Sequence, residues 1–203
     1  MDIRKPVTTN PGHFNNRKII LASQSPRRRQ LLEWAEIDFE VIVASTDESF
    51  PPELSITEIP VYIAKQKALE VKSLPEAAGA IVIAADTVVV SDGKIIGKPQ
   101  SPENAFEILS GLSGRVHQVI TGVCLSGKTE YSFPDVTYVE FHRLTEEEIW
   151  FYVDKYKPYD KAGAYGIQEW IGVTGIKSIH GDFYNVMGLP VSRVLQALKT
   201  GNL

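Results

Sequence analysis

The chain has 203 residues, 43% of them hydrophobic, and a formal net charge of −4 at pH 7. This length and composition predict a soluble globular protein with a well-formed core. The negative charge argues against a general nucleic-acid binder, although it allows a local basic pocket for a phosphorylated small molecule.

The single cysteine and the N-terminal segment bear on compartment and domain organisation. Cys124 lies in an apolar run at 119–125, so no intrachain disulfide forms and we expect a buried structural thiol. No signal peptide or apolar run of membrane length is visible, which predicts a cytoplasmic protein without a membrane partner. Residues 1–16 are polar and predict a flexible N-terminal tail before a single domain at 17–203.

The first part of the chain is predicted to alternate strands and helices. Ser25 is placed to cap a helix, and Pro26 stands at its first position. Asp47 and Glu48 fall in an acidic loop that follows the second strand. The predicted elements of this part are strands at 18–22 and 39–43 and helices at 27–35 and 57–72.

The stretch at 81–99 is predicted to be central, and it reads IVIAADTVVVSDGKIIGKP. It contains a strand of buried type and a hairpin turn at Asp92-Gly93. Asp86 and Thr87 stand between its two apolar halves, where an unpaired carboxylate would cost several kcal/mol. We therefore expect Asp86 to be paired, bound to a metal or exposed in a cleft, with Lys98 as the nearest basic candidate in sequence.

The second part of the chain adds further helices and strands. Ser101 and Thr145 are predicted to cap helices, and Pro158 to end the second of them. Because strands alternate with helices but hairpins also occur, the sequence predicts an α/β domain with a mixed sheet. The predicted elements are helices starting at 102, 146 and 191, a strand at 116–125, extended chain through 141, and a glycine-rich segment at 159–190.

The segment SQSPRRR at 23–29 predicts an anion site. A strand that turns into a capped helix presents free backbone N–H groups and the positive end of the helix dipole. Ser23 and Ser25 add hydroxyl groups, and an arginine at the helix start can bind phosphate with two hydrogen bonds. Consecutive helical residues point in different directions, so Arg27 is the first candidate, Arg28 the second, and Arg29 is expected to face solvent.

A second candidate segment is DKAGAYGIQ at 160–168. Its small residues and glycines allow a ligand close to the backbone, while Lys161 offers a charge and Gln168 both a donor and an acceptor. The segment GDFYNVMGLP at 181–190 is similar but weaker. The four histidines show no metal-ligand spacing, so no zinc site is predicted.

Carboxylates and basic side chains together predict magnesium-assisted phosphoryl chemistry. Magnesium prefers one or two carboxylates together with phosphate oxygens, and this mixture suits cleavage within the phosphate chain of a nucleotide. A Walker-type loop and a serine-hydrolase elbow are both absent from the sequence. The candidate carboxylates are Asp86, Glu48 and Asp47, and the candidate cations are Arg27, Lys67, Lys98 and Lys161.

In combination these motifs resemble those of the Maf family, the septum-formation-inhibitor-like nucleoside triphosphate pyrophosphatases. The resemblance extends from residue 18 to about residue 198. Its blocks are LASQSPRRRQLL at 21–32, AADTVV at 84–89, GKP at 97–99, LSGRVHQVITGV at 112–123, DKAGAYGIQ at 160–168 and GDFYNVMGLP at 181–190.

The resemblance implies an elongated, two-lobed fold like that of inosine-triphosphate pyrophosphatases, with the active site in a central cleft. It implies hydrolysis of a nucleoside triphosphate to the monophosphate and pyrophosphate with a divalent cation, Mg²⁺ or Mn²⁺. Asp86 matches the proposed general base. The specificity positions match Arg27, Thr87 and Gln168, and further cleft positions match Ser23, Glu48, Lys67 and Lys98.

The block AGAYGIQ is similar to that of the family branch that acts on dTTP and UTP. We therefore expect a pyrimidine nucleoside triphosphate pyrophosphatase that cleanses the nucleotide pool. The expected metal ligands are Asp86 and Glu48, but which carboxylate acts as base stays open. Two alternatives remain, a 7-methyl-GTP pyrophosphatase and a cell-division regulator that acts by binding, and the sequence leaves a homodimer open.

Overall fold

In the computed structural model, which describes residues 17–200 and 203, a seven-stranded mixed sheet forms the centre of the fold. The strand order is β2-β1-β3-β5-β6-β7, and β4 pairs with β3 outside this path. The pairs of β1 are parallel and the other pairs are antiparallel, which confirms the predicted α/β class with a mixed sheet.

The secondary-structure elements have the following bounds. Strands are β1 (Ile19–Leu21), β2 (Glu40–Val41), β3 (Ile81–Ser91), β4 (Lys94–Ile96), β5 (Val116–Ser126), β6 (Glu130–Phe141) and β7 (Ile176–His180). Helices are α1 (Pro26–Trp34), α2 (Ile59–Lys72), α3 (Pro102–Leu112), α4 (Glu146–Tyr156), α5 (Trp170–Gly175), α6 (Phe183–Met187) and α7 (Val191–Lys199), with short 3₁₀ helices η1 (Pro75–Ala77) and η2 (Ala162–Ala164). Within the described ranges, none of these helices is long and apolar enough to cross a membrane.

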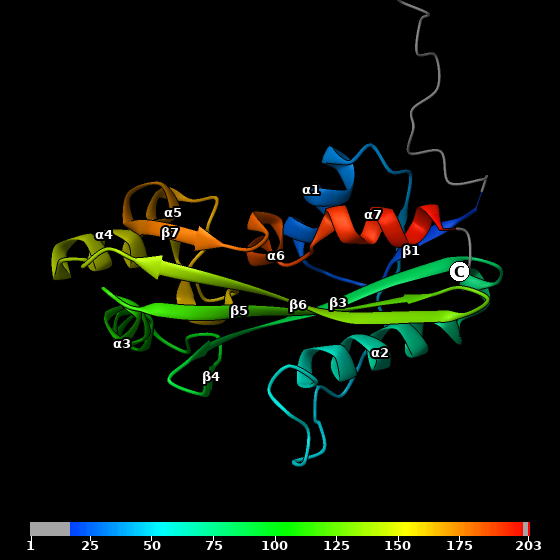
Figure 1. The fold of residues 1–203 in the computed structure, drawn as a ribbon, viewed down its shortest axis with the longest axis horizontal. Helices are drawn as coiled ribbons and strands as arrows, with labels where there is room; N and C mark the ends of the chain where they lie inside the picture. The colour runs from blue at the N-terminus through cyan, green and yellow to red at the C-terminus, as the bar shows by residue number, and fades with distance from the viewer. Residues whose placement is uncertain (1–16, 201–202) are drawn as a thin grey trace, which may run out of the picture.

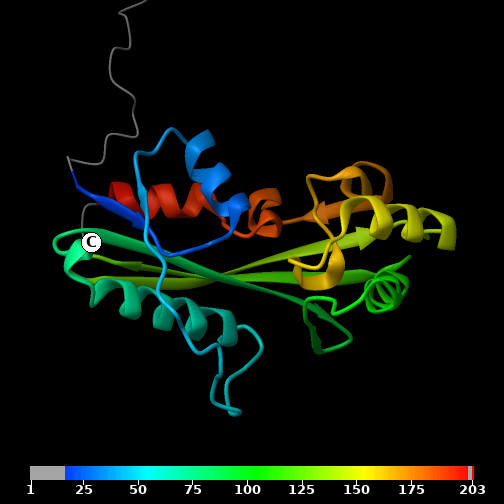
Figure 2. The same ribbon diagram turned by 180° about the vertical axis from the view of Figure 1, so that it is seen from behind.

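The molecule is elongated because β3, β5 and β6 run along most of its length (Figure 1). At one end α2 covers one face of the sheet, while α1 and α7 lie on the other face. At the other end lie α3, α4, α5 and β7, and the view from behind shows the same two groups (Figure 2). Two groups of helices therefore share one set of long strands.

Three of the predicted helix starts, those after Ser25, Ser101 and Thr145, are confirmed by their caps. The Ser25 hydroxyl accepts a hydrogen bond from Arg28 N at 3.4 Å, and Ser101 accepts one from Asn104 N at 3.1 Å. Thr145 forms a complete capping box with Glu148. These side chains satisfy backbone N–H groups that have no partner within the helix, so the local sequence determines where each helix begins.

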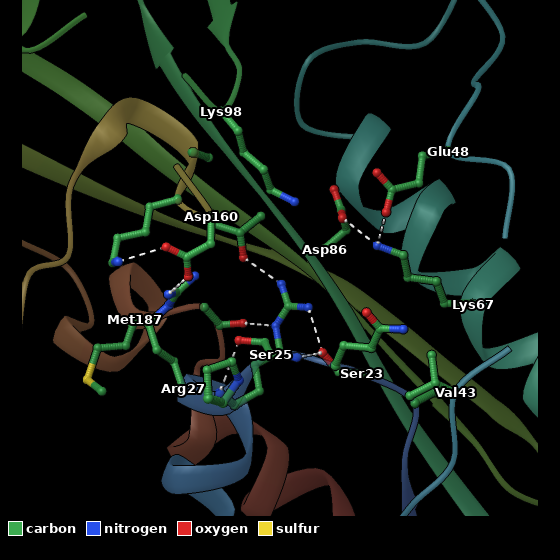
Figure 3. A pocket seen from close by; sticks show the side chains of 18 of the residues that line it. Ser23, Ser25, Arg27, Val43, Glu48, Lys67, Asp86, Lys98, Asp160 and Met187 are labelled. Carbon is green, nitrogen blue, oxygen red and sulfur yellow. Dashed lines mark hydrogen bonds and ion pairs between the residues drawn. The ribbon is translucent and has the colours of Figure 1, made fainter. Parts of the chain in front are cut away.

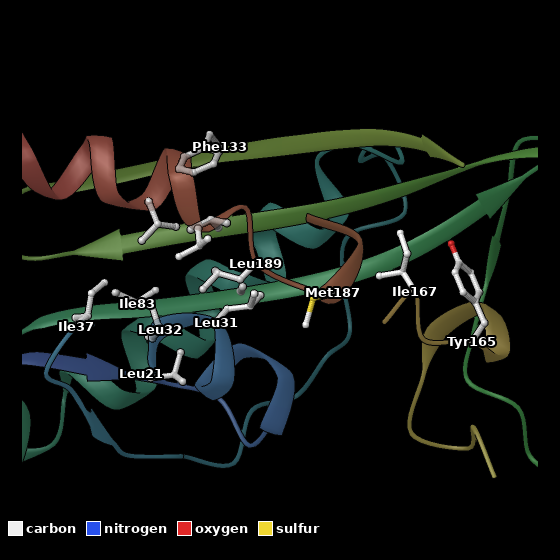
Figure 4. Close-up of a cluster of buried hydrophobic side chains, with 14 of the residues drawn as sticks. Leu21, Leu31, Leu32, Ile37, Ile83, Phe133, Tyr165, Ile167, Met187 and Leu189 are labelled. Carbon is white, nitrogen blue, oxygen red and sulfur yellow. The ribbon is translucent and has the colours of Figure 1, made fainter. Parts of the chain in front are cut away.

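The strand β3 packs on both of its faces. Ile81, Ile83 and Ala85 belong to the larger hydrophobic cluster, which includes residues of α1 and α7 (Figure 4). Val82 and Ala84 belong to a second cluster with residues of α2. Successive side chains of a strand point to opposite faces, so this pattern also determines the faces of the residues that follow.

The buried thiol predicted for Cys124 is confirmed. Cys124 is fully buried in the second cluster, and burial raises the pKa of its thiol to about 12. The expected flexible tail at 1–16 lies outside the described residues.

The glycine-rich segment at 159–190 is more ordered than the sequence predicts. It contains η2, α5, β7 and α6, none longer than six residues. Elements this short show no readable periodicity, and β7 is stabilised by pairing with β6. The strand β3 runs unbroken from Ile81 to Ser91, through Asp86 and Thr87.

One edge of β3 is left open in the middle of the molecule. On this edge β1 pairs with residues 81–83, and β4 pairs with residues 89–91. The opposite edge is paired with β5 from Val82 to Val90. Among the described residues no strand pairs with the first edge at 84–88, so Asp86 and Thr87 lie at a gap in the sheet.

We predict that Gly122→Ala destabilises the protein, because β5 and the start of α2 touch at this position. A Cβ atom at Gly122 would stand 2.1 Å from the backbone of Pro60 and Val61. Relieving such an overlap costs about 1 to 3 kcal/mol or more of unfolding free energy, measurable by denaturant titration.

Gly111→Ala is the matched control. Gly111 lies in α3, and a Cβ atom at this position would have no other atom within 4 Å. Alanine is therefore expected to stabilise the protein by about 0.5 to 1 kcal/mol. Equal effects of the two substitutions would contradict the proposed close contact at Gly122.

Candidate active site

The gap in β3 opens into a central cavity of about 570 Å³ (Figure 3). Its wall is formed by the start of α1, the loop after β2, one face of α2, the residues after β4, the segment 160–168 and the end of α6. Among the described residues, five basic and three acidic side chains line it. They are Arg27, Arg28, Lys67, Lys98 and Lys161, and Glu48, Asp86 and Asp160.

On the α2 side of β3, one lysine joins two carboxylates. Lys67 Nζ lies 2.8 Å from Asp86 Oδ1 and 2.7 Å from Glu48 Oε1. Asp86 shares a strand face with the α2-facing residues Val82 and Ala84, which explains why its partner comes from α2. The ion-pair partner is therefore Lys67 and not Lys98, the candidate nearest in sequence.

Lys98 is exposed and extends from beyond the end of β4 toward Asp86 (Figure 3). It forms part of the cavity wall and contributes to the positive potential at Glu48. The pKa of Glu48 is lowered chiefly by the hydrogen bond from Lys67, against the opposing effect of partial burial. Glu48 is therefore a carboxylate at neutral pH.

Asp86 and Glu48 form a donor set that suits a hard divalent cation. Because the same ammonium group contacts both, the two carboxylates are directed at one position in the cavity. Within the described part of the chain no group of three or more His, Cys, Asp or Glu side chains is placed for a metal. Mg²⁺ commonly binds one or two carboxylates and completes its shell with water and substrate phosphates, and this pair fits that mode.

On the other side of β3, Arg28 is held by three hydrogen bonds. Its Nε donates to Gly188 O at 2.7 Å, one terminal nitrogen donates to Ser23 Oγ at 3.2 Å, and the other donates to Thr87 Oγ1 at 3.0 Å. Thr87 also shares a hydrogen bond of 2.9 Å with Thr121. Burial lowers the pKa of Arg28, while Asp86 raises it. Arginine keeps its charge in proteins, so this side of the cavity carries a fixed positive charge.

Arg27 and Arg28 thus occupy different parts of the cavity. The sequence favoured Arg27 as the first phosphate ligand, and Arg27 does line the cavity, but it is bound to Asp160 Oδ2 at 2.7 Å. Arg28 is the more buried of the two. Arg29 is exposed, as predicted, because it points away from the cavity around the helix.

The segment 160–168 brings two further predicted residues to the cavity. Lys161 is 8% exposed, and its Nζ lies 2.8 Å from Asp160 Oδ1 and 3.2 Å from Glu169 Oε1. Burial opposes ionisation of Asp160, but hydrogen bonds from Lys161 and Arg27 outweigh it and lower the pKa to about 2. Gln168 is exposed at the cavity wall with its amide accessible.

Sequence reasoning missed several residues of the wall. Asp160 escaped notice because its partner Arg27 lies 133 positions away in the chain. Apolar lining residues carry no chemical signal of their own, and Val43, Val89, Val119, Val186 and Met187 belong to this group. His117 is buried, and its Nε2 lies 2.7 Å from the Tyr165 hydroxyl oxygen, within hydrogen-bond distance. Burial lowers the pKa of His117 to about 4, which suits a structural histidine.

The family model described as Maf-like protein matches residues 18–201. The chain belongs to the Maf family. This Maf chain is 51% identical over 191 residues to a protein of Bacteroides thetaiotaomicron, a match that covers 93% of this chain and 98% of the relative. It is 52% identical over 184 residues to a protein of Parabacteroides distasonis, covering 90% of this chain and 95% of the relative. Both relatives are named dTTP/UTP pyrophosphatase.

The Maf chain also resembles a solved structure. A HAM1 protein from Coxiella burnetii matches with a TM-score of 0.50 and 16% identity, covering 91% of this chain and 99% of that one. At this identity the likeness concerns the fold. It supports the predicted fold class and says nothing of residue roles.

We predict that Lys67→Gln raises the pKa of Glu48 toward its ordinary value. Lys67 is the largest cause of the lowered pKa, so without its ammonium group the carboxyl group takes up a proton at higher pH. A carbon-13 NMR titration of the glutamate carboxyl groups measures the shift.

Lys65→Gln is the matched control, since Lys65 lies on the same helix and pairs with Glu130 at 3.0 Å. This substitution is expected to leave Glu48 unchanged. An unchanged Glu48 titration in Lys67→Gln would show that the ion pair does not control this carboxylate.

Proposed function

We propose that this Maf protein is a cytoplasmic enzyme that hydrolyses dTTP and UTP to the nucleoside monophosphate and pyrophosphate, and so cleanses the nucleotide pool. The observation that carries the proposal is the arrangement at the gap in β3. A carboxylate pair bound to Lys67 faces a fixed arginine across one cavity. The names of the relatives supply the substrate class.

The charge of the cavity wall suits a polyanionic substrate. Its basic side chains outnumber its acidic ones by five to three. Cations fixed in a partly enclosed site stabilise charge that grows on a phosphate chain without having to reorganise during the reaction. We assign this role to Lys98, Lys67 and Arg27, and assign Ser23 and Arg28 to the phosphate-binding wall.

In the reaction, a water oxygen forms a bond to the α-phosphorus while the bond from that phosphorus to the bridging oxygen breaks. Pyrophosphate leaves with the electron pair of the broken bond. Asp86 accepts the proton of the water as general base, held in position by Lys67.

Asp86 and Glu48 would hold the divalent cation, Mg²⁺ or Mn²⁺. When bound, this ion supplies Lewis-acid polarisation of a phosphoryl oxygen and a lower pKa of water. Lys67 contacts both carboxylates and so holds them near one another.

Base recognition is assigned to Gln168. Its amide offers one acceptor and two donor hydrogens, which match the N3–H and a ring carbonyl that uracil and thymine share. Cytosine lacks this N3–H, so it would leave a polar group of the site without a partner. Lys161 supports the segment that carries Gln168, and Thr87 and Arg27 complete the specificity positions.

We predict efficient hydrolysis of dTTP and UTP, much poorer hydrolysis of CTP and the purine triphosphates, and discrimination between dTTP and UTP within about 10- to 200-fold, because they differ at the base by one methyl group. A panel of nucleoside triphosphates, with phosphate and pyrophosphate measured separately, tests this. Preference for 7-methyl-GTP would contradict the proposed substrate class, and absence of any turnover would favour a binding role.

We predict that Asp86→Asn nearly abolishes turnover and leaves the fold intact, because the amide cannot accept the proton. Steady-state kinetics and thermal unfolding measure the two effects. Asp135→Asn is the control, since Asp135 also sits in a strand and pairs with Arg193 at 2.7 Å, but outside the cavity. Near wild-type turnover of Asp86→Asn would mean that another group is the base.

A further inference from the structure

A chain of side chains with alternating charge connects α1 with the segment 160–169. It begins at the phosphate-facing Arg27, which bonds Asp160 at 2.7 Å, and continues to Lys161 at 2.8 Å. Lys161 pairs in turn with Glu169 at 3.2 Å, and Glu169 accepts a hydrogen bond from the hydroxyl of Tyr152. The chain therefore leads out of the cavity to α4.

Glu169 is the junction of this chain. One carboxylate oxygen contacts Lys161 and the other contacts Tyr152. The same tyrosine hydroxyl accepts a hydrogen bond from Gly166 N at 3.0 Å. Burial, with a smaller contribution from Glu169, raises the pKa of Tyr152, so the phenol stays protonated and donates to the carboxylate.

The carboxylate also packs directly against the backbone. A Cβ atom at Gly166 would stand 2.8 Å from Glu169 Cδ, so a side chain there would displace the carboxylate. In addition Glu169 N donates to Gly166 O at 3.0 Å. Hydrogen bonds thus restrain the backbone on both sides of Gln168. They lead to Tyr152, which is fully buried and therefore held in place by its surroundings.

We propose that Glu169, held by Tyr152, is the positioning residue that fixes Gln168 for base recognition and, through Lys161 and Asp160, fixes Arg27 at the phosphate end. The proposal rests on the function proposed above for Gln168. Glu169 does not line the cavity, so it acts through its neighbours and not on the substrate. One carboxylate then links the two ends of the nucleotide site.

The physical basis is the precision that hydrogen-bond recognition requires. A recognising group displaced by about 1 Å loses much of its selectivity, and side chains reach this precision only when a supporting shell holds them. Glu169→Gln keeps the size of the side chain but removes the ion pair with Lys161. Tyr152→Phe keeps the ring but removes the hydroxyl that joins Glu169 to Gly166.

The experiment measures kcat and KM for UTP and CTP in Glu169→Gln, Tyr152→Phe and the double variant. We expect KM for UTP to rise, and the UTP-to-CTP ratio of kcat/KM to fall about 10-fold, while kcat for UTP changes less. The double variant should lose little beyond either single variant, because both substitutions loosen the same Glu169 carboxylate.

Glu140→Gln is the matched control. Glu140 pairs with Lys177 at 2.7 Å and accepts a hydrogen bond from Ser178 at 2.9 Å, so it has the same kinds of partner as Glu169, but none of its partners lines the cavity. Its substitution is expected to leave the UTP-to-CTP ratio unchanged. A merely structural role of Glu169 would lower kcat/KM for both nucleotides equally and leave their ratio intact, which would overturn the proposal.

Amide hydrogen exchange separates this proposal from the proposed function. Faster exchange at 161–168 is expected in Glu169→Gln and Tyr152→Phe, without any substrate. If the wild-type enzyme does not hydrolyse UTP, the proposed function fails. Exchange equal to that of the wild type would overturn the positioning role in either case, and faster exchange with an unchanged nucleotide ratio would overturn its link to specificity.

Discussion

The site depends on the gap in the edge of β3. Over much of its length this strand has neighbours on both edges, but between β1 and β4 no strand in the described part of the chain lies beside residues 84–88 on one edge. Asp86 and Thr87 are consecutive, so their side chains point to opposite faces of the sheet. At a closed sheet they would lie in separate compartments. At the gap, a single cavity reaches both.

This geometry places two groups of charged side chains on opposite faces of the sheet. On one face Lys67 holds two carboxylates, and on the other Arg28 is held by a carbonyl and two hydroxyl groups. Burying a charged group is costly unless its hydrogen-bonding capacity is satisfied, and these partners offset much of that cost. They also hold the groups in place before substrate arrives, which is the condition under which fixed charges assist a reaction.

The third group of charges lies in the segment 160–169 and has a different origin. It is held from α4, at the far end of the molecule from α2 (Figure 1). The cavity is thus assembled from both ends of the elongated sheet. Arg27 joins them, since α1 packs at the α2 end and Asp160 belongs to the other. The alternation of charge from Arg27 to Glu169 leaves each member with an opposite neighbour.

The sequence by itself determined the local features of this protein. The caps Ser25, Ser101 and Thr145 placed three helix starts, since each cap acts on residues two or three positions away. The motifs around Asp86 and Gln168 also indicated the family, because their spacing is a property of the chain. Only the tertiary structure decided that Asp86 pairs with Lys67 and not Lys98, and that Arg28 lies deeper than Arg27. The first outcome depends on which face of β3 meets α2, and the second depends on where Gly188 and Thr87 contact α1. These contacts join segments that are distant in sequence, so they leave no local sequence pattern.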